Sequence, residues 1–403
     1  MKIMQVNVVY KTGSTGKIVY DMHRGLREQG ISSVVCYGRG KKVNEPDVYK
    51  TSGEILAKFN NIKSRFTGLL YNGSWLATAK LISVIKNEQP DLVHLHCING
   101  FFVNIYKIID FLKRNKIKTV LTLHAEFMYT GSCGHAYECE KWKTGCGNCP
   151  QLSEATHSYL LDRTHTAWVK MKTAFEGFDD NLIVTSVSPW LAERAKQSPI
   201  LQDRKHCVVL NGIEIKEIFH PSGYEFLKKR HGLASEKILL HVTADFTGQA
   251  KGGQFIIELA CRLAKDNVKI IVIGNRKKGI LLPANIIDIG RLNDQKELAA
   301  YYSMADLTVL ASKRETFSMI CAESLSCGTP VVGFRAGAPE QISLKTYSEF
   351  VEYWDIDKLE IAVRKWMENE KTNYSNIAKD AMAKYSRETM CKEYLAVYEQ
   401  LLK

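Results

Sequence analysis

Short runs of β-branched and aliphatic residues alternate along the chain with segments of helical periodicity, and this alternation limits the fold more than any other feature. In the first half the strand candidates are residues 6–9, 33–37, 92–96, 119–124 and 182–187. Apolar residues recur at helical spacing from Ile18 to Leu26, and Gly30 follows as a stop, so we expect a crossover helix over residues 16–29. Strands connected by helices pair in parallel, which predicts an α/β, doubly wound parallel sheet.

The second half repeats this order, with strand candidates at residues 238–242, 268–273, 286–289, 307–310 and 330–332, and helices at 254–264 and 296–303. A length of 403 residues exceeds what one hydrophobic core usually serves. The turn at Asn211-Gly212-Ile213 and the break at His220-Pro221 mark a hinge. We therefore expect Rossmann-like domains over residues 1–219 and 220–385. An amphipathic helix over 386–403 follows and could pack against either domain, including back onto the first.

Basic residues outnumber acidic ones by 55 to 43, and the net charge of +12 favours an anionic partner: nucleic acid, a nucleotide or an anionic lipid. The basic residues are dispersed and no nucleic-acid-binding motif is seen, so nucleic acid is the weakest of these partners. No apolar run reaches the roughly 18 residues needed to cross a bilayer, and no secretory signal is visible before the first strand. Eleven cysteines without such a signal favour a reduced, cytoplasmic compartment.

The segment 312–332 carries the clearest chemistry, because it runs strand, loop, helix, glycine and strand. Glu315 lies in the loop, and Glu323 lies eight positions later on the helix, so both carboxylates would border one cavity at the carboxyl edge of the sheet. A diphosphate would suit the free N–H groups at the expected helix start, those of Phe317, Ser318 and Met319. Two Glu at this spacing can also form a solvated helix face, but the apolar neighbours of Glu323 favour a functional role.

This segment resembles the signature of the retaining glycosyltransferases of family four, which have the GT-B fold. The matching text is Glu315-Thr316-Phe317, Glu323, Gly328-Thr329-Pro330-Val331-Val332 and the turn Gly337-Ala338-Pro339-Glu340. Two further matches are Asn211-Gly212-Ile213 and Ala305-Asp306-Leu307. The resemblance covers essentially the whole chain. It implies two Rossmann-like domains facing across a cleft, with the nucleotide sugar held by the C-terminal domain and the acceptor by the N-terminal one.

The first half is most similar to the capsule, colanic-acid and exopolysaccharide enzymes of that family. The matching strings are Asp91-Leu92-Val93-His94-Leu95-His96, Leu121-Thr122-Leu123-His124, Thr130-Gly131-Ser132-Cys133 and Trp142-Lys143-Thr144-Gly145-Cys146-Gly147-Asn148-Cys149-Pro150. The resemblance implies transfer of a hexose-type sugar from a nucleotide sugar, with retention, to an undecaprenyl-linked glycan at the inner face of the cytoplasmic membrane. UDP-sugars are mildly preferred over GDP-sugars as donors.

The resemblance also assigns roles to three residues of the second half. Glu323 matches the residue that holds the nucleotide ribose, and Glu315 matches the one that contacts the donor sugar hydroxyls. Lys251 matches the lysine that neutralises the diphosphate. Its place before two glycines at an expected helix start favours an anion role over that of one more solvated lysine.

In the first half, His124 matches the histidine near the donor sugar and the attacking hydroxyl. Without the resemblance, a lone His at a strand end would more often be a hydrogen-bonded core residue. The loop Gly13-Ser14-Thr15-Gly16 matches the family's glycine loop beside the phosphates and the acceptor, although one such loop is a weak signal. The catalytic candidates are therefore His124, Glu315 and Lys251.

One departure from the family pattern concerns the donor phosphates. Family members usually carry an Arg a few residues before the lysine, whereas residues 243–251 contain none. We expect Arg276 or Lys277 to substitute for that phosphate clamp. Otherwise the chain would be a catalytically impaired GT-B scaffold. Catalysis is expected to need no cofactor or metal, since the Asp-x-Asp at Asp355-Ile356-Asp357 is interpreted as a helix cap.

Four cysteines lie close together in the sequence: Cys133, Cys139, Cys146 and Cys149. The last two have the Cys-x2-Cys spacing of zinc knuckles, so the four thiols could enclose a structural zinc ion. Reduced buried thiols and a local disulfide are the alternatives.

Basic and aromatic residues are interleaved over residues 58–86, as at Lys63 and Phe66. Such a segment can lie on an anionic bilayer surface, or it can be core with solvated flanks. Gly68 and Gly73 argue against one continuous helix.

Overall fold

Two parallel sheets organise this computed structural model, which describes residues 1–277, 279–368 and 374–403. The first sheet has the strand order β3-β2-β1-β4-β5-β6-β7, and neighbouring strands run parallel. Its strands are β1 Lys2–Asn7, β2 Ser32–Tyr37, β3 Val48–Lys50, β4 Leu92–Leu95, β5 Lys118–Leu123, β6 Leu182–Ser186 and β7 Lys205–Val208. The order reverses between β1 and β4, which in doubly wound sheets is where ligands bind.

The second sheet has the order β10-β9-β8-β11-β12-β13 and is also parallel. Its strands are β8 Lys237–Asp245, β9 Val268–Asn275, β10 Ile286–Gly290, β11 Leu307–Leu310, β12 Val331–Phe334 and β13 Ser348–Val351. Here the order reverses between β8 and β11. The predicted α/β class, with two doubly wound parallel sheets, is confirmed.

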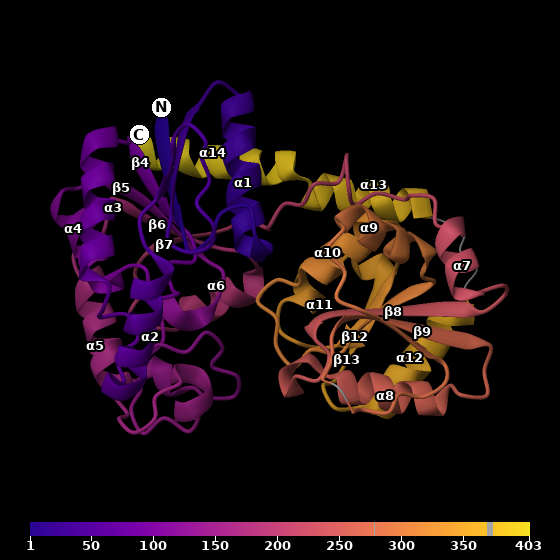
Figure 1. The fold of residues 1–403 in the computed structure, drawn as a ribbon. Coiled ribbons are helices and arrows are strands. Elements are labelled where there is room, and N and C mark those ends of the chain that lie inside the picture. Colours follow the sequence, from indigo (N-terminus) through magenta and orange to yellow (C-terminus); the bar gives the residue numbers. More distant parts are fainter. Residues whose placement is uncertain (278, 369–373) are drawn as a thin grey trace. The chain divides into compact units, whose positions relative to one another are not determined.

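The helices alternate with these strands along the chain, and most of them connect one strand to the next. In the first half they are α1 Gly13–Glu28, α2 Glu54–Thr67, α3 Trp75–Glu88, α4 Ile105–Arg114, α5 Thr164–Phe175 and α6 Pro189–Ala195, with short turns at Glu126–Met128, Lys141–Lys143 and Leu152–Thr156. In the second half they are α7 Glu225–His231, α8 Gly253–Arg262, α9 Gln295–Met304, α10 Met319–Ser326, α11 Pro339–Ile342, α12 Ile356–Glu368, α13 Tyr374–Tyr385 and α14 Arg387–Leu402, with short turns at Gln249–Lys251 and Lys345–Tyr347. Figure 1 shows α8 and α12 on one face of the second sheet and α9 and α10 on the other.

The core of the second half lies between its sheet and helices α8 and α12. Phe255 and Leu259 of α8 pack with Val363 of α12 against the strand residues Ile270 and Val309. Burying such side chains is the main favourable term in folding, at about 25 cal/mol per Å² of apolar surface. The alternation seen in the sequence therefore corresponds to a helix–sheet–helix sandwich.

The chain divides into two compact units. The first unit is Met1–Leu210 together with Met390–Lys403, and the second unit is Asn211–Thr389. The sequence analysis placed the boundary near residue 220, after the Asn211-Gly212-Ile213 turn. The structure places that turn in the second unit because the N–H of Ile213 donates to the carbonyl of Tyr385, and its carbonyl accepts from the N–H of Arg387.

Helix α14 starts in the second unit and ends in the first. The predicted apolar side is confirmed, since Met390, Tyr394, Val397 and Leu401 are buried. The Tyr398 hydroxyl lies 2.7 Å from Nδ1 of His94 on β4. In Figure 1 the yellow helix accordingly lies beside the strands of the first unit.

Some sequence-based boundaries were incomplete. Strands β3, β7 and β13 were missed because they are edge strands of three or four residues with few fully buried side chains. Helix α1 begins at Gly13, before the predicted residue 16. As expected, Gly68 ends α2 in a left-handed conformation, so segment 58–86 forms two helices. Within the described ranges, no helix combines the length and apolar composition needed to span a bilayer.

We predict that Tyr398→Phe destabilises the protein by about 1–3 kcal/mol, because it leaves the buried His94 ring nitrogen without its hydroxyl partner. Urea unfolding followed by circular dichroism would measure this change. The control is Tyr159→Phe, whose ring is exposed and whose hydroxyl contacts Arg65 at the surface. Equal stability of wild type and Tyr398→Phe would contradict the assigned hydrogen bond.

Candidate functional site

An ion pair joins two loops at the reversal point of the second sheet. Lys251 lies after β8 and Glu315 lies after β11, and Nζ of Lys251 is 2.7 Å from Oε1 of Glu315. The N–H of Lys313 donates to the carbonyl of Ala250 at 2.9 Å, which ties the same two loops together. Two of the three catalytic candidates are therefore in contact at the carboxyl edge where a ligand is expected.

Two glycines allow the Lys251 loop to approach the strand next to it. Gly252 has φ +73°, and a Cβ there would lie 2.0 Å from the carbonyl oxygen of Ala311. A Cβ on Gly253 would lie 2.0 Å from the carbonyl oxygen of Phe246. Any larger residue at either position would displace the backbone, so the glycines set the position of Lys251.

A third loop fixes the backbone of Glu315. The N–H of Glu315 donates to the carbonyl of Ala336, and the N–H of Ala338 donates to the carbonyl of Glu315. The carboxylate of Glu340 accepts from the N–H groups of Ala336 and Gly337 at 3.1 and 3.0 Å. The Gly337-Ala338-Pro339-Glu340 turn therefore supports the loop that carries Glu315.

Helix α10 begins later than predicted. Ser318, with φ +80°, is its N-cap, and its side chain accepts from the N–H of Cys321 at 3.3 Å. Phe317 precedes the helix and is buried, with its ring edge toward Tyr385. The helix therefore starts two residues after Phe317, with Ser318 as its N-cap and Met319 as its first residue.

Glu323 has a different partner from Glu315. Its carboxylate accepts from the hydroxyl of Tyr302 on α9 at 3.0 Å. Burial, with the Glu323 charge adding to it, raises the pKa of Tyr302 well above its usual value, so this hydroxyl stays a donor. That the two carboxylates border one cavity remains a prediction.

Arg276, expected to replace the missing phosphate-binding Arg, lies after the carboxyl end of β9. Its Nε is 2.6 Å from Oδ2 of Asp288, and Nη1 donates to the carbonyl of Ile280. Sequence reasoning overlooked the basic pair Lys313 and Arg314, which occupy the Glu315 loop itself. Their position immediately before Glu315 was the available signal.

In the first unit, Asn7 organises the loops at the β1/β4 reversal point. Its Oδ1 accepts from the N–H of Cys97, and its Nδ2 donates to the carbonyl of Val9 and lies 3.4 Å from Oγ1 of Thr15. Gly13, with φ +65°, and Ser14 are exposed at the start of α1. Gly16 is buried, and a Cβ there would lie only 3.0 Å from Cγ2 of Val9. The predicted glycine loop thus lies at this edge, and the sequence analysis missed Asn7.

His124 follows β5 and belongs to a cluster of three imidazoles. Its Nε2 is 3.3 Å from Nδ1 of His96, and the rings of His96 and His94 lie 3.8 Å apart. Nε2 of His94 is 2.6 Å from Oγ1 of Thr122. Burial lowers the pKa of His124 to about 4 and that of the other two well below the usual value. All three rings are therefore neutral near pH 7, and a neutral His124 can donate one hydrogen bond and accept another.

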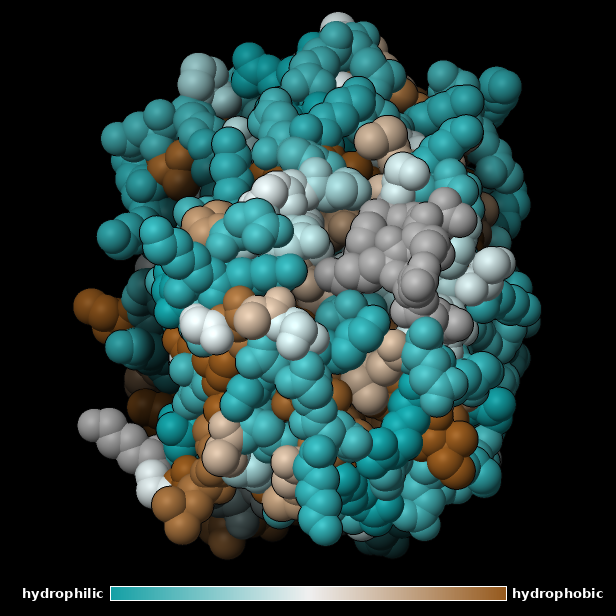
Figure 2. Space-filling model, turned by 90° about the vertical axis from the view of Figure 1, so that its right-hand side faces the viewer, coloured by the Kyte–Doolittle hydropathy of each residue, from teal (hydrophilic) through white to brown (hydrophobic). Residues whose placement is uncertain are grey.

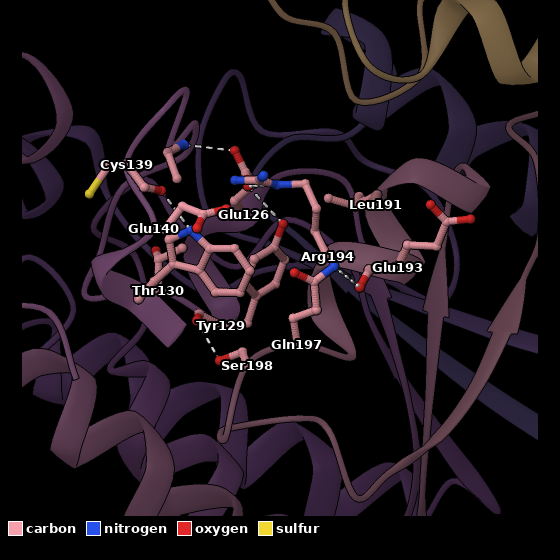
Figure 3. Close-up of polar contacts among 12 residues, drawn as sticks. Glu126, Tyr129, Thr130, Cys139, Glu140, Leu191, Glu193, Arg194, Gln197 and Ser198 are labelled. Atoms are coloured by element: carbon pink, nitrogen blue, oxygen red, sulfur yellow. Dashed lines mark hydrogen bonds and ion pairs between the residues drawn. The ribbon is translucent and has the colours of Figure 1, made fainter. Parts of the chain in front are cut away.

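The loop after His124 is anchored by a buried carboxylate (Figure 3). Oε1 of Glu126 is 2.7 Å from Nε of Arg194 on α6, and Oε2 accepts from the N–H of Ala136 at 2.7 Å. The Arg194 guanidinium also lies 5.0 Å from the ring centre of Trp142. A buried charge needs such partners, so this network fixes the loop that carries the four clustered cysteines.

The two units match two glycosyltransferase families. Residues 15–217 match the family described as Glycosyltransferase Family 4, and residues 224–388 match the family described as Glycosyl transferases group 1. The chain belongs to glycosyltransferase family four. The Lys251–Glu315 pair of this glycosyltransferase lies within the second match and His124 within the first.

Named relatives and solved structures agree with this assignment. A protein of Escherichia coli strain K12 named as a colanic acid biosynthesis glycosyl transferase is 24% identical over 421 residues, covering 100% of both chains. Sucrose-phosphate synthase from Thermosynechococcus elongatus has a TM-score of 0.69 at 15% identity, covering 100% of this chain and 99% of the other. Anabaena HepE in complex with UDP has a TM-score of 0.67 at 15% identity, covering 99% and 100%. The likeness of structure shows the GT-B fold.

We predict that the protein loses stability as the pH falls from about 6.5 to 5. Burial lowers the pKa of His23 and His124 to about 4, whereas an unfolded His protonates near 6.5. The unfolded chain therefore binds more protons in this window, and each such His costs up to about 1.4 kcal/mol per pH unit. Urea unfolding at several pH values would measure the slope. His23→Gln should flatten it, and a wild-type stability independent of pH over this range would contradict the prediction.

Proposed function

We propose that this glycosyltransferase moves a hexose-type sugar from a nucleotide sugar, a UDP-sugar in preference to a GDP-sugar, to a lipid-linked glycan during synthesis of a bacterial surface polysaccharide such as a capsule or exopolysaccharide. The observation that carries the proposal is the Lys251–Glu315 pair, held by three loops at the reversal point of the second sheet. The name of the Escherichia coli relative supports the polysaccharide pathway. The UDP complex of HepE supports the donor class.

In this proposal the second unit binds the donor. Lys251 would neutralise charge that develops on the diphosphate as the glycosidic bond breaks, together with backbone N–H groups at the start of α10. The carboxylate of Glu315, which lies 2.7 Å from Nζ of Lys251, would accept hydrogen bonds from hydroxyls of the donor sugar. Glu323 would hold the ribose. The chemistry uses these residues rather than a metal ion.

The first unit would bind the acceptor near His124 and the loop Gly13-Ser14-Thr15-Gly16. A neutral His124 can orient the attacking hydroxyl by a hydrogen bond without a charge that would compete for the diphosphate. In the retaining reaction that we propose, the hydroxyl would attack the face that the leaving group vacates, and its proton would pass to a phosphate oxygen.

We predict that a UDP-sugar raises the unfolding midpoint of the wild type, with about 2.7 kcal/mol of stabilisation at a hundredfold excess over Kd. Lys251→Ala and Glu323→Ala should lose this shift. Glu315→Ala should keep most of it, because the contacts to the diphosphate and the ribose remain, but should lose turnover by roughly a hundredfold, because the donor sugar is no longer held for the reaction. Thermal unfolding of each protein with UDP, GDP, CDP, ADP and dTDP sugars would measure donor binding. Release of nucleoside diphosphate would measure turnover.

The control for these variants is Lys265→Ala, an exposed position in the same unit that should leave binding and turnover unchanged. Unchanged donor binding and turnover in Lys251→Ala, Glu315→Ala and Glu323→Ala would refute the site. A second candidate function, a non-catalytic GT-B scaffold, is favoured by the lack of an Arg in residues 243–251. It would be supported if folded wild-type protein showed no shift with any sugar nucleotide.

Helix α2 supports a location at the inner face of the cytoplasmic membrane. Four large apolar side chains at helical spacing are each more than half exposed: Ile55, Phe59, Ile62 and Phe66. For this helix the alternative of a buried core stripe is therefore wrong. The ring of Phe66 contacts that of Tyr159 at 5.5 Å between centres, and the neighbouring Leu160 is 78% exposed, so the apolar surface continues onto a second segment.

Positive charge accompanies this apolar surface. Lys58 and Lys63 of α2 are exposed, and Arg65 donates to the hydroxyl of Tyr159. An apolar stripe with basic neighbours fits the surface of an anionic bilayer. The face of the protein shown in Figure 2 is by contrast mainly hydrophilic, with hydrophobic residues in small separate groups. We therefore propose that α2 faces the membrane that holds the acceptor.

We predict that the double variant Phe59→Ser with Phe66→Ser binds phosphatidylglycerol vesicles at least about tenfold more weakly than wild type, because each buried Phe contributes about 1.5–3 kcal/mol. Vesicle sedimentation would measure binding. The control is Phe226→Ser on α7 of the second unit, which is also exposed. Equal binding of the double variant and wild type, or no binding of the wild type, would contradict the proposed membrane surface.

A further inference from the structure

Four cysteines of the first unit line one small cavity. The cavity has a volume of about 20 Å³, and its wall includes Cys133, Cys139, Cys146 and Cys149. All four are half-buried and none forms a disulfide. This volume suffices for about one water molecule, and so for a single metal ion. Neither the family match nor the proposed reaction gives these thiols a role.

The turn from Cys146 to Cys149 has an unusual backbone conformation. Cys146, Gly147 and Asn148 have φ values of +56°, +95° and +44°, although the left-handed region is unfavourable for Cys. The turn therefore needs compensating interactions from its surroundings. The Cys-x2-Cys spacing that it closes is the spacing of metal knuckles.

A backbone amide points at one of the four sulfurs. The N–H of Gly131 donates to Sγ of Cys146 at 3.2 Å. A Cβ at Gly131 would lie 2.9 Å from that Sγ and 2.5 Å from the carbonyl oxygen of Thr164, so only glycine allows this approach. Amide donors stabilise a thiolate more than a neutral thiol, and such outer contacts are typical of metal ligands.

The cysteine loop is also held in place from the other side. The indole N–H of Trp142 donates to the carbonyl of Cys139 at 2.8 Å, and Trp142 stacks with the Arg194 that binds Glu126. Figure 3 shows the sulfur of Cys139 pointing away from the Glu126–Arg194 network. The backbone at Cys139 is therefore anchored, and the Cys139 thiol lines the cavity.

We propose that Cys133, Cys139, Cys146 and Cys149 bind one Zn²⁺ ion as a closed structural site. Among the described side chains no three Cys, His, Asp or Glu already meet at metal-binding distance, so binding requires the thiols to turn into the cavity that they share. Soft thiolates favour Zn²⁺ over Mg²⁺ or Ca²⁺. Binding converts thiols to thiolates and releases their protons to solvent. Four protein ligands leave no open position, so the ion would cross-link the loop that follows His124 rather than take part in transfer.

The first test is the metal content of the full chain, purified under reducing conditions without chelators and measured by mass spectrometry of the elements. The wild type should hold about one zinc ion per chain, as expected for a four-cysteine site. Cys146→Ser and Cys149→Ser should each lose most of it. The control Cys207→Ser, a half-buried thiol on β7 of the same unit, should retain it. Wild-type protein without zinc would overturn the proposal, as would unchanged zinc in both site variants.

A second measurement covers the case in which the serine variants fail to fold. Wild-type protein whose metal has been replaced by Co²⁺ should show sulfur-to-cobalt charge-transfer absorption and the visible bands of tetrahedral cobalt. A native protein that shows neither, or whose clustered cysteines are found joined in a disulfide by peptide mapping, would rule out the zinc site. These readouts need no sugar donor, so their outcome is separate from that of the proposed transfer reaction.

Discussion

Parallel strand pairing is the constraint on which the rest of this protein depends. Parallel neighbours must be joined by crossovers, so the loops that follow the strands collect at one edge of each sheet. In the second unit this brings the β8, β11 and β12 loops together, and backbone hydrogen bonds among them fix Lys251 and Glu315. In the first unit it brings the loops after β1, β4 and β5 to the edge where Asn7 and His124 lie.

The two edges differ in their electrostatics, in a way that suits a division of labour. The second unit presents a charged pair, Lys251 and Glu315, with the basic residues of the Glu315 loop beside it. The first unit presents imidazoles that burial keeps neutral, backed by hydroxyls of Thr122 and Tyr398. In the proposed reaction, an anionic donor would be attracted to the second unit, and the first unit would orient an uncharged hydroxyl.

Much of this arrangement could be predicted from the sequence, because local signals determined it. The strands that carry β-branched runs, the apolar side of α14 and the helix cap at Asp355 were all predicted, and Asp355 does accept from the N–H of Lys358. Contacts between distant segments left no such signal. The His94–His96–His124 cluster joins strands that are separated along the chain, and its tie to Tyr398 spans most of the sequence. The start of α10 was misplaced because Ser318 adopts φ +80°, which residue type alone does not predict.

The path of α14 has a consequence for the order in which the protein is made. Residues 390–403 complete the first unit, yet they are synthesised after the whole of the second unit. A nascent chain can therefore finish the second unit while His94 and Thr122 still lack the hydroxyls of Tyr398 and Tyr394. The synthesis of the first unit begins first, but this unit is completed last. The imidazole cluster therefore gains its tyrosine hydroxyl partners only after those residues have been translated.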